Sequence, residues 1–76
     1  MINTSKLGKK IADVRRSTGL TQNDLAMRVG ITAQAVSKWE QGKSCPDIAI
    51  LDEIADALGI SLFELLGMET QTESSS

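Results

Sequence analysis

Apolar residues recur at helical spacing in separate short stretches of this chain, and no stretch of useful length alternates as a strand does. Leu7, Ile11 and Val14 follow four-and-three spacing, which places them on one face of a predicted helix. Ser5 is a suitable cap for that helix, which we expect to run to about Ser17. The amino-terminal segment is therefore predicted to be an amphipathic helix.

The stretch Thr21–Gln41 predicts two short helices joined at a glycine. Thr21 and Asp24 have the spacing of a capping box, which satisfies free amides at the start of a helix. Gly30 stands where this helix must stop, because a left-handed backbone costs glycine less than a residue with a Cβ. Thr32 then caps the second helix.

The second of these helices has one apolar and one polar face. Val36 and Trp39 lie three apart on the inner face. The other face, here called the reading face, has no large apolar side chain and consists of Ala33, Gln34, Ser37, Lys38 and Gln41. Its amide, hydroxyl and ammonium groups suit hydrogen bonding to base edges and phosphates.

Two more helices are expected after the loop that contains Pro46. Asp47 caps a helix with repeating apolar positions that ends at Gly59. Ser61 and Glu64 then form a second capping box, opening a short helix that stops at Gly67. The predicted fold class is all-α with five helices.

We expect a single domain in residues 1–67 and a disordered tail or linker in residues 68–76. The 76 residues, 41% of them apolar, support only one small core. The tail sequence METQTESSS has no apolar periodicity and cannot offset the entropy lost on ordering.

The residue inventory excludes several kinds of chemistry. Cys45 is the single cysteine and there is no histidine, which excludes an intrachain disulfide, a zinc site and His-dependent catalysis. We expect no catalytic residue, metal or cofactor, and Cys45 as a semi-buried filler before Pro46. No apolar run is long enough for a membrane span or signal peptide, so we expect a cytoplasmic protein.

Charge is divided unevenly along the chain. The net charge is −2, but residues 1–43 hold all eight basic residues and three acidic ones, a net of +5. Residues 44–76 hold seven acidic residues and no basic one, a net of −7. The reading face thus falls in the basic half, which favours a polyanionic partner.

Arg15 differs from the other basic residues of the first helix. It lies four residues after Ile11 and eight after Leu7, so it flanks the apolar stripe and should be partly buried. A buried charge requires a partner, and Glu40 is the obvious candidate.

With these residues in view, the chain resembles the phage Cro and repressor (xenobiotic-response-element, XRE) family of helix-turn-helix DNA-binding proteins. The resemblance covers roughly residues 7–67. It rests on Gln22 and Ala26 in the first helix of the motif, on Gly30 in the turn, and on Val36 and Trp39 on the inner face of the second helix. The segments WEQGK and ALGIS extend it.

The resemblance implies roles for individual residues. It implies phosphate contacts for Gln22, at the amino end of a helix whose dipole favours an anion, and for Asn23, Thr32 and Lys43. It places Ala33, Gln34, Ser37 and Lys38 in the major groove, with Gln34 resembling an adenine-reading glutamine. Ala33 either packs against a thymine methyl or leaves its position to indirect readout. It also implies a structural ion pair of Arg15 with Glu40.

The leading hypothesis is a sequence-specific regulator of transcription, repressor-type, that binds double-stranded DNA as a homodimer on an inverted repeat. Candidate dimer contacts are Phe63, Leu66 and Met68, which could instead complete the core. No small-molecule ligand is evident. The alternative is a protein-interaction module, such as an antitoxin-like domain, whose acidic carboxyl half binds a basic partner.

Overall fold

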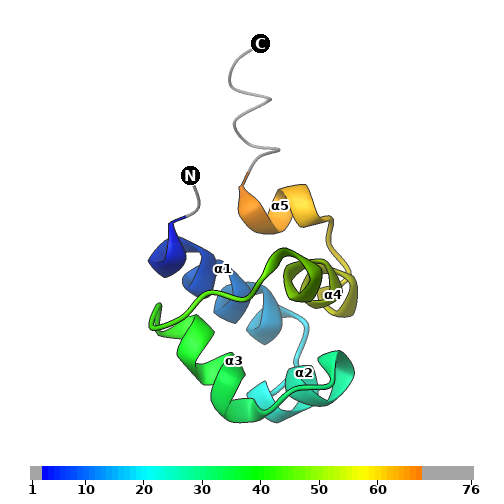
Figure 1. Cartoon of the computed structure of the whole chain (residues 1–76). Helices are drawn as coiled ribbons and strands as arrows, with labels where there is room; N and C mark the ends of the chain where they lie inside the picture. Colours follow the sequence, from blue (N-terminus) through cyan, green and yellow to red (C-terminus); the bar gives the residue numbers. More distant parts are fainter. Residues whose placement is uncertain (1–2, 68–76) are drawn as a thin grey trace.

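The computed structural model describes residues 3–67, and all regular structure in that range is helical. The helices are α1 (Thr4–Ser17), α2 (Gln22–Val29), α3 (Ala33–Glu40), α4 (Ile48–Leu58) and α5 (Leu62–Leu66). In Figure 1, α2 and α3 lie together at one end of the molecule, and α5 lies at the other end. The predicted five-helix, all-α fold is confirmed. The expected tail, residues 68–76, lies outside the described residues.

Side-chain caps start the helices largely where the sequence predicts. Thr21 and Asp24 form a reciprocal capping box at α2, with both bonds at 3.0 Å. Thr32, Asp47 and Ser61 accept the expected backbone N–H groups at α3, α4 and α5.

The predicted cap of the first helix was wrong. Asn3, not Ser5, caps α1, because the Asn3 side-chain oxygen accepts the Lys6 N–H at 3.0 Å. Ser5 is exposed inside the first turn of the helix. Asn and Ser are equally good caps, so local sequence does not choose between two candidates this close together.

The turn between α2 and α3 depends on Gly30. Its φ of 82° lies in the left-handed region, and its N–H bonds to the Ala26 carbonyl oxygen at 2.8 Å. The Ile31 N–H bonds to the same oxygen at 2.9 Å. These two hydrogen bonds to one carbonyl oxygen end α2 abruptly and set the direction in which α3 leaves.

One core joins all five helices. Helix α1 packs on α3 and α5, while α2 packs on α3 and α4. The largest of the fully buried side chains are Ile11, Leu25, Val36, Leu51, Ile54 and Leu65. Cys45 is exposed, so the prediction of Cys45 as a semi-buried filler was wrong; the neighbouring Pro46 is buried instead.

Helices α1 and α3 meet backbone to backbone at Gly8. A Cβ built on Gly8 would overlap the carbonyl oxygen of Trp39 and lie 3.1 Å from that of Glu40. Only glycine permits this approach, so α1 directly supports the carboxyl end of α3.

None of the helices within residues 3–67 combines the length and apolarity that crossing a bilayer requires.

Candidate nucleic-acid interface

Helix α3 exposes the polar side chains that the sequence assigned to base reading. Gln34 and Lys38 are exposed, whereas Ala33 and Ser37 are half-buried. On the opposite side of the helix, Val36 is fully buried, and Trp39 is nearly so. The buried face fixes the rotation of α3 about its axis, which leaves the reading face directed to solvent.

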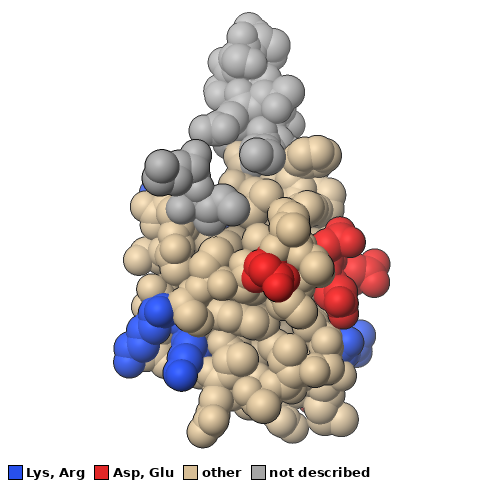
Figure 2. Space-filling model, viewed as in Figure 1, with Lys and Arg blue, Asp and Glu red and all other residues tan. Residues whose placement is uncertain are grey.

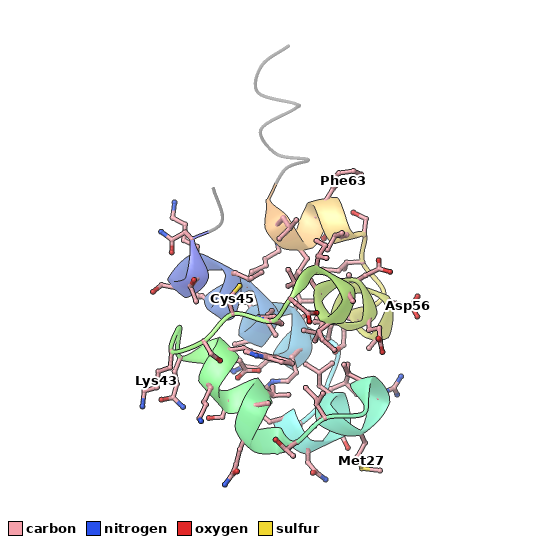
Figure 3. The ribbon with its side chains drawn as sticks, viewed as in Figure 1. Met27, Lys43, Cys45, Asp56 and Phe63 are labelled. Atoms are coloured by element: carbon pink, nitrogen blue, oxygen red, sulfur yellow. The ribbon has the colours of Figure 1, made fainter. Side chains whose placement is uncertain are left out.

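Three of the four residues assigned to phosphate contacts are exposed at the borders of this face. Thr32 accepts the Ala35 N–H at 3.2 Å, and its hydroxyl proton remains free to donate. Asn23 lies in the first turn of α2, and Lys43 follows α3 in a loop. Figure 3 shows Lys43 beside the end of α3, on the half of the molecule that α2 and α3 form.

The fourth phosphate candidate, Gln22, is half-buried and already has a protein partner. Its Nε2 donates to Glu40 Oε1 at 2.9 Å. The sequence assignment did not include this bond, because the two residues lie eighteen positions apart and meet only through the angle between α2 and α3.

The expected pairing of Arg15 with Glu40 is present. Arg15 Nε lies 2.6 Å from Glu40 Oε2, and Arg15 Nη2 lies 3.1 Å from Glu40 Oε1. The side chains are 10% and 6% exposed. Arg15 Nη1 also donates to the Leu20 carbonyl oxygen at 2.8 Å, so this guanidinium joins α1, the α1–α2 loop and α3.

The environment of the ion pair lowers the pKa of Glu40 and raises the pKa of Arg15. Burial raises the pKa of Glu40, but the hydrogen bonds from Arg15 and Gln22 and the guanidinium charge outweigh it, leaving the pKa below its ordinary value. The hydrogen bond to Glu40 raises the pKa of Arg15. The pair is therefore charged at neutral pH.

Gln41 belongs to the reading face but had no assigned contact. Its Nε2 donates to Ser37 Oγ at 2.7 Å. This bond occupies an acceptor position of the Ser37 hydroxyl and leaves its proton available as a donor. The i, i+4 spacing of the two residues could have indicated the contact from sequence.

The surface carries a basic cluster near α3 and an acidic cluster on α4. In Figure 2, a group of Lys and Arg side chains lies at the lower left, beside α3, and a group of carboxylates lies at the right, over α4, with basic side-chain atoms also just below these carboxylates. The exposed acidic residues of α4 are Asp52, Glu53 and Asp56. No group of three or more His, Cys, Asp or Glu side chains within residues 3–67 could hold a metal ion.

The chain matches the helix-turn-helix family HTH_3 over residues 11–65. It is 38% identical over 66 residues to the HTH-type transcriptional regulator y4dJ of Sinorhizobium fredii, covering 87% of this chain and 86% of that protein. It is 37% identical over 62 residues to the cryptic phage CTXphi transcriptional repressor RstR of Vibrio cholerae, covering 82% of this chain and 55% of RstR.

Solved structures agree on the fold. The restriction-modification controller protein C.AhdI from Aeromonas hydrophila superposes with a TM-score of 0.80 at 28% identity, over 83% of this chain and 91% of that one. The hydroxypropylphosphonic acid epoxidase from S. wedmorenis matches with a TM-score of 0.79 at 26% identity, over 86% of this chain but 35% of its own. The fold therefore occurs both in whole regulators and as part of an enzyme.

Proposed function

Because this chain belongs to the Cro/C1-type family of helix-turn-helix transcriptional regulators, we propose that it binds one specific DNA sequence as a homodimer and represses by occupying it. The observation that carries the proposal is the reading face. The apolar side of α3 is buried in the core, so the helix presents Gln34 and Lys38 to solvent. An α-helix fits the major groove, where base pairs are distinguishable.

Gln34 is the proposed base reader. A glutamine amide offers one donor and one acceptor, which match the N7 acceptor and N6 donor of adenine. Ser37 and Lys38 lie three and four residues further along, on the same side of the helix, so they reach neighbouring bases. Ala33 presents a methyl group that suits contact with thymine.

The proposed backbone contacts surround that face. Lys43 supplies a charge, while Asn23, Thr32 and Gln22 supply neutral donors near the amino ends of α2 and α3. Backbone contacts of this kind fix the register of the protein on the duplex but carry no sequence information.

The proposed dimer forms through α5. Phe63 is 60% exposed, and Figure 3 shows it at the end of the molecule opposite α2 and α3, where pairing leaves the reading face free. Leu66 is half-buried and packs partly against the core, and Met68 lies outside the described residues. A symmetric pair presents two reading helices to half-sites about one helical turn apart, which predicts an inverted repeat.

The test is selection of bound duplexes from a random pool, followed by titration of the selected and a scrambled duplex at several salt concentrations. We expect an inverted repeat, a preference over the scrambled duplex, and an affinity that falls steeply as salt rises. Failure to enrich any sequence, with no binding at low salt, would refute the proposal. Persistent binding to a basic protein in excess DNA would favour the alternative, an interaction module using the acidic side of α4.

A further inference from the structure

A continuous chain of hydrogen bonds links the structural ion pair to the reading end of the molecule. It runs from Arg15 on α1, through Glu40 at the end of α3, to Gln22 at the start of α2. Glu40 Oε1 receives both the 3.1 Å bond from Arg15 Nη2 and the 2.9 Å bond from Gln22 Nε2. A buried ion pair thus touches a side chain proposed to touch DNA.

We propose that Glu40 is the positioning residue for the Gln22 phosphate contact: its carboxylate holds the Gln22 amide with one N–H directed outward to the DNA backbone. This inference rests on the proposed function, because it assumes the Gln22 contact. It adds a role for Glu40, and through it for Arg15, beyond stabilising the fold.

The chemistry of the amide fixes its orientation. A carboxylate is an acceptor only, so the nitrogen of the Gln22 amide, and not its oxygen, must face Glu40. That nitrogen carries two hydrogens, and Glu40 accepts one. The second remains for a phosphate oxygen, which also only accepts. An unrestrained amide would turn its oxygen toward the phosphate in part of its rotamers, and those rotamers cannot bind.

The ion pair also makes the carboxylate acceptable near DNA. An unpaired carboxylate one side chain away from a phosphate would repel it. Arg15 offsets that charge with two bonds to Glu40, and only 6% of the Glu40 side chain is exposed. The guanidinium therefore keeps Glu40 ionised as an acceptor for Gln22 while cancelling most of its field at the phosphate.

The experiment is a double-mutant cycle on DNA affinity with the full chain, using Gln22→Ala, Glu40→Asp and the double variant. Aspartate keeps the charge that Arg15 needs but shortens the reach to Gln22. The ligand is one mixed-sequence duplex at low salt, since a phosphate contact needs no specific site. Binding is measured at a temperature where circular dichroism shows each variant folded.

We expect Gln22→Ala to weaken binding about tenfold, the effect of losing one hydrogen bond to a charged group. Glu40→Asp should weaken it about threefold in the wild-type background and not at all in the Gln22→Ala background, because coupled residues fail to add. The control Ile54→Val, a change in the core at α4, lowers stability without touching the network and should leave affinity unchanged.

The outcomes separate the two proposals. Wild-type protein that binds no duplex removes the proposed function itself. Wild-type binding with an unaffected Gln22→Ala variant, or with Glu40→Asp and Gln22→Ala effects that simply add, overturns the positioning role and leaves DNA binding in place.

A spectroscopic measurement distinguishes positioning from a purely structural role. In ¹⁵N spectra, the side-chain amide of Gln22 is identified by its loss in Gln22→Ala, and the proton that Nε2 donates to Glu40 should resonate away from the position of a solvated glutamine amide. Adding duplex should shift the outward proton. Glu40→Asp should return the inner proton toward the position of a solvated glutamine amide, while backbone signals of α4 stay in place. If both Gln22 amide protons of the wild-type protein resonate where those of a solvated glutamine do, the inference is contradicted even if the variants of Glu40 fold poorly.

Discussion

Replacing Arg15 with methionine should destabilise this protein more than any change at an exposed basic residue. Methionine approximates the aliphatic length of arginine but donates no hydrogen bond, so Glu40, with 6% side-chain exposure, keeps only Gln22 as a side-chain donor. Breaking a buried ion pair in this way costs about 3–5 kcal/mol. For a domain of this size, such a loss lowers the melting temperature by roughly 12–40 °C.

Arg16→Met is the matched control. The Arg16 side chain is 66% exposed, and its partner Asp13 lies 3.7 Å away and is also exposed. Exposed pairs of this kind contribute little, so we expect a change within about 0.5 kcal/mol. Urea unfolding and thermal melts at pH 7 measure both variants.

The effect should depend on pH with a definite sign. The folded-state pKa of Glu40 lies below its ordinary value of 4.5, so the pair contributes fully above about pH 4.5 and is lost as pH falls through the lower folded value. In Arg15→Met, we expect burial to raise the Glu40 pKa, because the guanidinium no longer offsets it. Acid then protonates the buried Glu40 and removes the cost of burying its charge, so the variant loses less stability than at pH 7. The gap in unfolding free energy between wild type and variant should therefore shrink from pH 7 to pH 3. Equal melting temperatures for the two methionine variants at pH 7, or a gap unchanged at pH 3, would refute the reasoning.

Three further predictions concern DNA contacts, helix packing and assembly. Gln34→Ala should lower the binding free energy on the selected duplex by about 1–3 kcal/mol and relax the preference at one base position. Lys43→Ala should weaken binding to all duplexes alike and lower the slope of log affinity against log salt by about one unit. Titrations on selected and scrambled duplexes compare the two variants. Gly8→Ala should destabilise by about 1–3 kcal/mol or more in urea unfolding, because its Cβ meets the Trp39 carbonyl. Phe63→Glu should convert a dimer to a monomer in sedimentation experiments without loss of secondary structure, since Phe63 is 60% exposed.

Each of these predictions has an opposing result. Uniform weakening of every duplex by Gln34→Ala would move base reading to Ser37, Lys38 or DNA shape. A Gly8→Ala protein with wild-type stability would show that α1 and α3 can separate at no cost. A wild-type protein that sediments as a monomer, both free and with selected DNA, would remove the α5 dimer.

Local signals made much of this fold predictable. The caps Thr21, Thr32, Asp47 and Ser61 each bond to a backbone amide three residues ahead, so sequence spacing alone identifies them. The fold follows because these starts combine with one apolar stripe per helix. The start of α1 was misplaced, since Asn3 and Ser5 are equally suitable caps and only the observed bond to Lys6 decides between them.

What sequence could not supply is geometry between helices. The Gln22–Glu40 bond depends on the angle between α2 and α3. The burial of Pro46 and the exposure of Cys45 depend on the path of the loop between α3 and α4. Gly8 is an intermediate case. A lone glycine beside an apolar stripe indicates a close backbone approach, but not which helix makes it.

The backbone contact at Gly8 has a consequence for redesigning specificity. Main-chain atoms of α1 and α3, together with the buried Val36 and Trp39, hold the reading helix in place, and the exposed side chains Gln34 and Lys38 are not part of that support. The groups that hold α3 in place are therefore different from the side chains proposed to read bases. The two exposed positions can be randomised in a library while the scaffold stays constant, so that new DNA preferences can be selected without first repairing the stability of each clone.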